Sequence, residues 1–159
     1  MGIDPGSNRT GYGVLEVRND RPALVVAGVI DAGRKGLADR LVKIFNGLTA
    51  VIEKFQPKVI ALEEVFHARN ARSALVLGHA RGIVLLAAGL AGVPVCEYSP
   101  ARVKRTVSGD GKADKKQISK MLGFWLGSAP SQPDASDAVA VALCHIHWAG
   151  ESNNHRNDQ

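Results

Sequence analysis

The sequence predicts an α/β protein built on a five-stranded mixed sheet, with three antiparallel strands followed by two parallel strands and with flanking helices. Short apolar segments separated by turn residues fill the first thirty positions, which is typical of an antiparallel meander. From residue 37, an apolar repeat of three and four residues is followed by a short continuous apolar run, and this alternation occurs twice. Continuous runs of this kind are typical of parallel strands covered on both faces.

The three antiparallel strands are expected at residues 1–4, 10–17 and 23–30. The Gly-containing segment 5–8 and the polar segment 18–22 separate them and have the composition of turns. Because both connections are short, each strand should pair with the next one along the chain.

The parallel part of the sheet is expected from the next four elements. An amphipathic helix over residues 37–55 ends at Gln56-Pro57, since proline cannot continue a helix. A buried strand at 58–64, a helix at 72–90 and a second buried strand at 93–98 complete a βαβαβ alternation.

Two further helices are expected at residues 114–126 and 133–148, separated by a segment rich in Gly, Ser and Pro. Residues 1–150 are expected to form a single domain, because no linker or internal repeat divides them. The polar tail at 151–159 is expected to be disordered, since it has too few apolar residues to join a core.

The composition favours an intracellular protein with a polyanionic partner. Twenty Lys plus Arg against fifteen Asp plus Glu give a net charge of +5 and a pI near 9.5, as in many nucleic-acid-binding proteins. Cys96 and Cys144 stand far apart in apolar runs, which indicates reduced core residues. The start of the chain lacks a signal-peptide pattern, and no apolar stretch reaches the roughly 20 residues that span a bilayer.

Four acidic residues lie at the edges of predicted apolar elements in this basic chain. Asp4 and Glu63 end predicted strands, where ligands bind in sheets of this kind. Asp134 and Asp137 are three residues apart at the start of a helix and therefore share a face. Each has an alternative explanation: Asp4 could form a turn, Glu63 could be solvated, and Asp134 and Asp137 could cap their helix. A shared site for Mg²⁺, which prefers oxygen ligands, explains all four.

Such a site suits phosphodiester hydrolysis. Cutting a phosphodiester with water requires a nucleophile and neutralisation of the charge on the leaving oxygen. Two Mg²⁺ ions about 4 Å apart perform both tasks, and three or four carboxylates commonly hold them.

Several motifs resemble those of the RuvC-type Holliday junction resolvases. The segments GIDPGS at 2–7 and TGYG at 10–13 resemble the opening of this family. The segment at 61–66, ALEEVF, with the following NARSAL at 70–75, resembles its second acidic motif. DASDA at 134–138 resembles the third, in the same order, so the resemblance covers about residues 2–147.

The resemblance implies an RNase H-like fold and a homodimer that nicks two opposed strands of a four-way DNA junction in recombination and repair. The family pattern makes Asp4, Glu63, Asp134 and Asp137 the metal ligands, with Asp4 bridging two Mg²⁺ ions and Mn²⁺ as a possible substitute. It selects Glu63 over Glu64, which points to the opposite face of the strand. It also implies a bacterial cytoplasmic enzyme that works with the RuvAB branch-migration complex and leaves a 5′-phosphate.

Predicted DNA contacts fall in two segments. Seven basic residues lie in the first: Arg102, Lys104, Arg105, Lys112, Lys115, Lys116 and Lys120. Lys112, Lys116 and Lys120 are four residues apart and would form one stripe on a helix, for which a solvated helix face is the alternative explanation. We expect phosphate contacts from Lys104, Lys112, Lys115 and Lys116, and the family uses basic residues at the positions of Lys104 and Lys115.

The second DNA-contact segment follows Glu63. Phe66 could be a core residue, but beside an active site its ring could stack on an unpaired base at the junction centre. Arg69, Asn70 and Arg72 are expected to contact the DNA backbone or bases nearby.

A stripe of small residues marks a possible dimer interface. Ala74, Gly78 and Gly82 recur every four residues on the predicted helix 72–90 and would let another helix approach closely. That helix could belong to a second copy, as symmetric nicking requires, or to the same chain.

Parts of the sequence are also compatible with three other functions. A YqgF-like RNase H-fold nuclease acting on RNA has a similar opening motif. An actin-like ATPase also begins with Asp-x-Gly after a strand but needs two such domains. A non-catalytic DNA-binding module would need only the basic residues, and four clustered acids would then repel its ligand.

Overall fold

The five-stranded mixed sheet predicted from the sequence is present in the computed structural model, which describes residues 1–64 and 70–154, the last five by their backbone alone. The sheet has the order β3-β2-β1-β4-β5, in which β1, β2 and β3 pair antiparallel and β4 and β5 are parallel to β1. The strands are β1 (Gly2–Asp4), β2 (Arg9–Arg18), β3 (Arg21–Asp31), β4 (Ile60–Glu63) and β5 (Val95–Tyr98).

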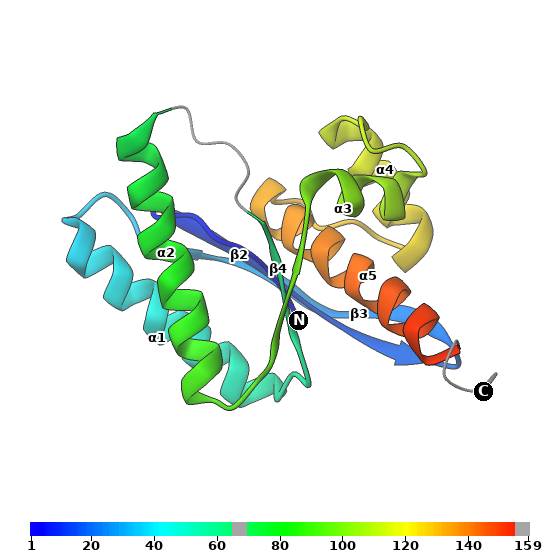
Figure 1. Cartoon of the computed structure of the whole chain (residues 1–159), viewed down its shortest axis with the longest axis horizontal. Helices are drawn as coiled ribbons and strands as arrows, with labels where there is room; N and C mark the ends of the chain where they lie inside the picture. Colours follow the sequence, from blue (N-terminus) through cyan, green and yellow to red (C-terminus); the bar gives the residue numbers. More distant parts are fainter. Residues whose placement is uncertain (65–69, 155–159) are drawn as a thin grey trace.

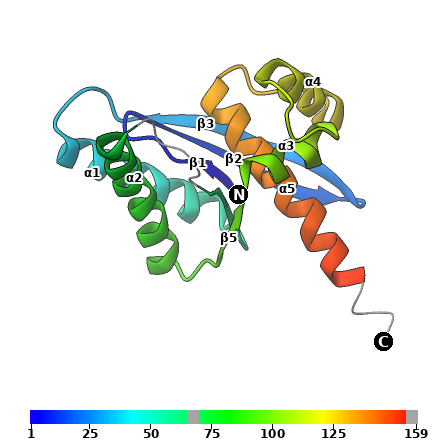
Figure 2. The same ribbon diagram turned by 45° about the horizontal axis from the view of Figure 1, so that its top comes forward.

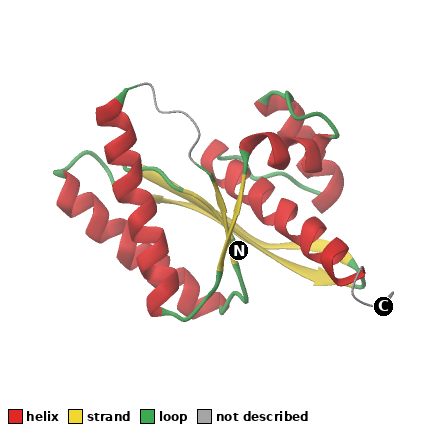
Figure 3. Ribbon diagram, in the orientation of Figure 1, coloured by secondary structure: helices red, strands yellow, loops and turns green. Residues whose placement is uncertain are grey.

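Helices cover both faces of this sheet (Figures 1 and 3). One group consists of α1 (Leu37–Phe55) and α2 (Ala71–Leu90), and the other of α3 (Pro100–Ser108), α4 (Lys115–Leu126) and α5 (Pro133–Asn154). Figure 2 shows the same separation after rotation, with α5 beside the strands and α1 and α2 together on the other side. The result is three layers, helix on sheet on helix.

Two hydrophobic cores result, one on each face of the sheet. Leu62 packs in the core formed with α1 and α2, together with Leu48 and Val84. Its neighbour Ala61 packs in the other core, with Val139 of α5. Because successive strand residues point to opposite faces, this division shows which side chains of β4 face α5.

Three glycines let α5 lie unusually close to the sheet. A Cβ atom on Gly2 would lie 2.0 Å from the Ala138 carbonyl oxygen, one on Gly11 would lie 1.9 Å from the Asp134 carbonyl oxygen, and one on Gly13 would lie 2.4 Å from Val139 Cγ2. Real Cβ atoms do not approach other heavy atoms so closely, so no other residue fits at these positions without movement of α5. The strands and the helix backbone are therefore in direct contact.

Two features differ from the sequence-based prediction. The helix α3 was not predicted, because it has only nine residues and buries only two of them, Val103 and Val107. Ser99 caps it by accepting a hydrogen bond from the Arg102 amide, and Pro100 follows at the first helical position, as is common at helix starts. The helix α5 continues to Asn154, into the segment for which disorder was expected.

Candidate active site

The pairing of β1 with β4 places Asp4 and Glu63 side by side. The two strands are parallel with Gly2 opposite Ala61 and Ile3 opposite Leu62, so Asp4 and Glu63 lie at equivalent positions two residues beyond the first pair. Since Ala61 faces α5, Glu63 faces α5 as well, and Glu64 follows on the opposite side. The register therefore agrees with the selection of Glu63 rather than Glu64.

The first turns of α5 bring the other two carboxylates to the same place. Gly11 pairs with Asp4 across the β1–β2 ladder, and the Asp134 backbone lies directly over Gly11. Asp137 follows one helical turn later and faces the same strand ends. All four predicted acidic residues thus lie near the carboxyl ends of β1 and β4, close enough for Asp137, Glu63 and Asp134 each to raise the pKa of Asp4.

The electrostatics of the four acids reflect this grouping. Burial raises the pKa of Asp4 to about 7, with further contributions from the negative charges of Asp137, Glu63 and Asp134. Burial also raises the pKa of Glu63, with Asp137 adding to the effect. A buried carboxylate among like charges ionises readily only when a cation is nearby.

Two basic side chains of the protein offset part of this negative charge. The Arg9 guanidinium lies 2.9 Å from a carboxylate oxygen of Asp134 and also donates to the side-chain oxygen of Gln132 at 3.3 Å. The Lys115 ammonium lies 2.6 Å from a carboxylate oxygen of Asp137, and this hydrogen bond raises the pKa of Lys115. Asp4 and Glu63 have no such direct ion pair within the part of the chain that the structure describes.

The donor set fits a hard divalent cation. Four carboxylates provide only oxygen ligands, as Mg²⁺ prefers, and a bound cation would offset the burial and the negative charges that raise the pKa of Asp4. Within residues 1–64 and 70–154, no three His, Cys, Asp or Glu side chains converge closely enough to hold an ion. Asp134 and Asp137 are engaged by Arg9 and Lys115 and would have to leave these partners to bind a metal.

Predicted DNA contacts on α3 and α4 lie around the carboxylates. Lys104 of α3 and Lys115 both oppose the rise in the pKa of Glu63, which places both ammonium groups near it. Lys116 is exposed beside Lys115, and Lys112 is exposed in the turn before α4. The basic side chains therefore border the acidic cluster on the side of α3 and α4.

The other predicted contacts precede or open α2. Asn70 is the N-cap of this helix, and its side-chain oxygen accepts a hydrogen bond from the Ser73 amide at 2.9 Å. This local role explains Asn70 without DNA, although its amide NH₂ group remains available for contact. Arg72 is exposed in the first turn. Phe66 and Arg69 lie outside the described residues.

The stripe of small residues on α2 does not pack against another helix of the described chain. Cβ atoms added at Gly78 and Gly82 would meet no atom within 4 Å, and Leu75 and Leu90 are 66% and 72% exposed. This rules out internal packing within the described residues as the reason for the stripe. By length and composition alone α2 could also cross a membrane, and 22% of its most apolar stretch is buried.

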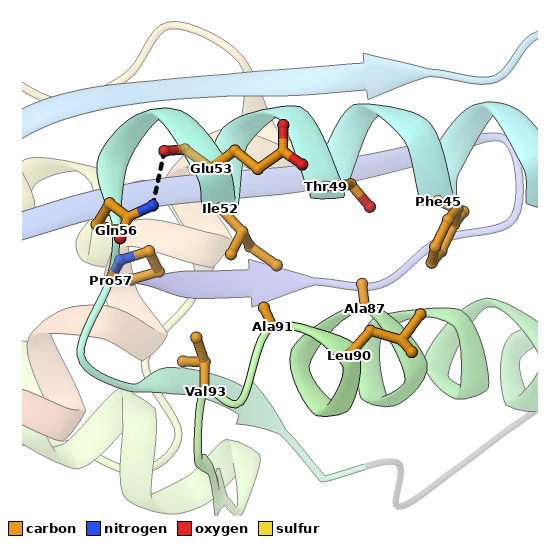
Figure 4. Close-up of a pocket in the computed structure, with 10 residues that line it drawn as sticks. All are labelled: Phe45, Thr49, Ile52, Glu53, Gln56, Pro57, Ala87, Leu90, Ala91 and Val93. Atoms are coloured by element: carbon orange, nitrogen blue, oxygen red, sulfur yellow. Dashed lines mark hydrogen bonds between the residues drawn. The ribbon is translucent and has the colours of Figure 1, made fainter.

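A separate hollow of about 390 Å³ lies between the carboxyl-terminal ends of α1 and α2 (Figure 4). Its lining includes Gln56 and Val93, which precede β4 and β5, so it lies at the opposite end of these strands from Glu63. Glu53 is the one ionisable side chain among the residues that line it. This hollow therefore offers none of the chemistry of the carboxylate cluster.

Comparison with known proteins decides between the resolvase and its alternatives. A family model described as crossover junction endodeoxyribonuclease RuvC matches residues 1–145. The chain belongs to this family. Its members are metal-dependent endonucleases, which accords with the four carboxylates, and the RNA-acting YqgF-like alternative and the non-catalytic module gain no support.

Individual relatives agree over nearly the whole chain. The crossover junction endodeoxyribonuclease RuvC of Geobacter sp. (strain M21) is 47% identical over 154 residues, which cover 96% of this chain and 94% of the relative. The protein of the same name from Halorhodospira halophila is 49% identical over 151 residues, with 92% and 89% covered.

Solved structures give the same result. Thermus thermophilus RuvC superimposes with a TM-score of 0.87 at 34% identity, covering 95% of each chain. T. thermophilus RuvC in complex with Holliday junction substrate also gives 0.87, at 36% identity, with 93% of this chain and 92% of that chain covered. The yeast mitochondrial resolvase Ydc2, at 20% identity and a TM-score of 0.72, shares the fold.

Sequence reasoning missed two contributors to this site. Gly11 was noted only as part of a motif, and its position under Asp134 depends on a helix more than 120 residues away in the chain. Arg9 was not singled out, and its ion pair with Asp134 spans a similar separation. The alternation of glycines at 11 and 13 in a strand was the one available signal, since it often marks close backbone approach.

Proposed function

We propose that this protein resolves four-way DNA junctions by symmetric, metal-dependent hydrolysis of two opposed strands. The observation that carries the proposal is the meeting of Asp4, Glu63, Asp134 and Asp137 at one end of the sheet in a chain of the RuvC family. The T. thermophilus relative solved with a Holliday junction supports the choice of substrate.

The four carboxylates would hold Mg²⁺, with two ions in each active site and Mn²⁺ as a substitute. When bound, the metal supplies positive charge that activates water and neutralises the leaving oxygen. Burial and the neighbouring negative charges raise the pKa of Asp4 to about 7, so its carboxylate would gain from a bound cation and would help to hold the metal. Lys104 and Lys115 border the cluster and would contact the phosphate beside the cleaved bond.

Two groups of residues would hold the DNA. Lys104, Lys112, Lys115 and Lys116 contact phosphates, which orients the junction without reading its sequence. Phe66 stacks on an unpaired base at the junction centre, and Arg69, Asn70 and Arg72 contact the strands beside it. Residues 1–150 act as one domain.

The active form is a homodimer joined through α2. Two opposed nicks need two active sites related by a twofold axis, and an isologous interface provides this geometry. The exposed leucines and uncovered glycines of α2 form an apolar surface of the kind that dimer interfaces bury. Membership of a bacterial family further suggests action in the cytoplasm together with the RuvAB branch-migration complex.

The test is cleavage of an end-labelled four-way junction in Mg²⁺, in Mn²⁺ and in EDTA. We expect paired nicks on opposed strands with either metal and none in EDTA. Asp4→Asn should still bind the junction but lose cleavage, because an amide is a weaker ligand for a hard cation.

A linear duplex of the same sequence is the control substrate. Cutting of the duplex as fast as the junction would contradict resolution as the function and leave a general nuclease. Undiminished cutting by Asp4→Asn would contradict the carboxylate site.

A further inference from the structure

A groove with lysine and serine side chains in its lining extends from the carboxylate cluster along α4. It measures about 480 Å³ and lies between α4 and the first turns of α5. Asp137 and Lys115 stand at its catalytic end, and Lys116, Ser119 and Lys120 continue it along α4. Ser131 and Ser136 contribute to the facing wall. The groove therefore connects the predicted cleavage position with a row of hydrogen-bond donors.

The positive charge of the groove is unbalanced. Lys115 is paired with Asp137, whereas neither Lys116 nor Lys120 has an ion pair within the described ranges 1–64 and 70–154. Two uncompensated lysines four residues apart, about 6 Å along the helix axis, would attract a ligand with repeated negative charges.

The wall that carries these lysines is firmly anchored. Asp114 and Gln117 form a capping box at the start of α4, and Ile118 and Leu122 are buried in the core. Trp125 donates a hydrogen bond from its indole nitrogen to the Val107 carbonyl oxygen at 3.1 Å, which ties α4 to α3. The exposed side of α4 is therefore held in place relative to the carboxylates.

An exposed aromatic residue lies beyond the second lysine. Phe124 is four residues after Lys120 and eight after Lys116, so it continues the same stripe of α4. Its side chain is 79% exposed, which is unusual for phenylalanine in a chain with a well-formed core. A lysine row followed by an exposed ring suits a nucleic acid strand, because phosphates meet the lysines and a sugar or base meets the ring.

We infer that this groove binds the cleaved DNA strand on one side of the cut, with successive phosphates on Lys116 and Lys120 and the next nucleotide against Phe124. This inference rests on the proposed function and adds to it the path of the strand as it leaves the active site. The contacts are to backbone and sugar, so they fix the register of the scissile phosphate without selecting a sequence.

The test combines charge-neutral variants with charge-neutral DNA. Junction binding in EDTA, where the DNA stays intact, is measured by fluorescence anisotropy between 50 and 200 mM salt for Lys116→Gln, Lys120→Gln and Phe124→Ser. Each lysine variant should lower the slope of log affinity against log salt by about 1. The affinity deficit of each should therefore shrink about fourfold across this salt range.

Phe124→Ser removes no charge, so it should weaken binding without changing the slope. Lys43→Gln is the matched control, because Lys43 is an exposed lysine of α1, away from the groove. It should change neither quantity.

Single methylphosphonates, which neutralise one phosphate, then locate the contact. Each phosphate of the cleaved strand is replaced in turn, and the replacement should weaken wild-type binding at two adjacent positions on one side of the cut. At those positions they should have no further effect on the Lys116→Gln, Lys120→Gln double variant.

Two results overturn the inference while leaving the proposed function intact. One is a salt slope for the lysine variants equal to that of Lys43→Gln, in a protein that still cuts junctions. The other is a methylphosphonate effect that is equal on both sides of the cut or persists in the double variant. Failure of the wild-type protein to prefer a junction over a linear duplex would instead remove the proposed function and this inference together.

Discussion

The helices α5 and α2 are both long and rich in small residues. Even so, much of α5 is buried, whereas much of α2 is exposed. Ala138, Val139 and Cys144 of α5 are fully buried. On α2, Leu75 and Leu90 are largely exposed and Gly78 faces open space.

The difference lies in what faces the small residues. Glycines of β1 and β2 lie under the small residues of α5, so helix and strands touch and the carboxylates of α5 reach Asp4. The small residues of α2 have no such counterpart within the described chain. The same residue types therefore place two candidate catalytic acids against the sheet in one helix and leave a surface uncovered by the described chain in the other.

The largest expected effect comes from filling the contact under α5. Gly11→Ala places a methyl group against the Asp134 carbonyl and should force α5 away from the sheet. We expect a loss of about 3 kcal/mol in the free energy of unfolding, measured by urea denaturation. Junction cleavage should fall about 100-fold, because displacement of Asp134 and Asp137 by about 1 Å misaligns the site.

Gly78→Ala on α2 is the matched substitution. At concentrations low enough for the chain to be monomeric, it should stabilise the protein by about 0.5–1 kcal/mol, since alanine is the better helix former and the added methyl meets nothing within the chain. Equal destabilisation by the two substitutions would contradict the difference between the helices.

The charge enclosed beneath α5 should be visible in the pH dependence of stability. The pKa of Asp4 is raised to about 7 from 3.8, so the folded state holds this proton more tightly than the unfolded state does. In EDTA, stability should therefore increase as the pH falls from about 7 towards 4 and level off below that. Asp4→Asn should weaken this dependence, with the contribution of Glu63 remaining, and should be more stable than wild type at pH 8 by a few kcal/mol.

Denaturation curves at several pH values provide the measurement. Identical pH dependence in Asp4→Asn and wild type would mean that the carboxylates are not crowded together.

The open surface of α2 can be tested by making it polar. Leu75→Ser with Leu90→Ser should convert the proposed dimer to a monomer in sedimentation velocity experiments. Both side chains are mostly exposed within one chain. The free energy of unfolding of the variant should therefore lie within about 0.5 kcal/mol of that of the wild-type monomer at the same low concentration.

Val42→Ser, at an exposed position of α1, is the control and should remain dimeric. A dimer that persists in the leucine variant would place the interface elsewhere. Binding of the wild type to neutral lipid vesicles would assign the apolar surface of α2 to a membrane instead.

The smallest expected effect concerns Lys115, whose ammonium group is paired with Asp137. Lys115→Gln removes the ion pair at 2.6 Å and should raise the affinity for Mn²⁺ severalfold in calorimetric titrations without DNA. Junction affinity should fall at the same time, because a phosphate contact is lost. Unchanged metal affinity would indicate that Lys115 does not compete with the metal for Asp137.

Much of the fold could be predicted because it depends on local patterns. The apolar repeat of α1 and the continuous apolar run around Leu62 indicate a helix and a buried strand wherever they occur. Asp4 and Glu63 follow such segments directly, so their position at strand ends could be read from the chain. The short helix α3 buries only Val103 and Val107, too few residues for a recognisable repeat.

The contacts that complete the site could not be predicted in this way. The ion pair between Arg9 and Asp134 and the close approach over Gly11 join parts of the chain that meet only after folding. No local pattern distinguishes Gly11 from Gly78, since the outcome depends on which element packs against each one. Resemblance to a family identified the acids, whereas their neighbours required the structure.

The order of the acids along the chain has a consequence for how the nuclease is made. A ribosome releases the strands that carry Asp4 and Glu63 long before α5, which holds the last two acids and is the last helix of the fold. An incomplete chain can neither assemble the carboxylate cluster nor close the core beneath α5. The proposed cleavage activity therefore requires that translation has passed residue 137 and that α5 has packed on the sheet.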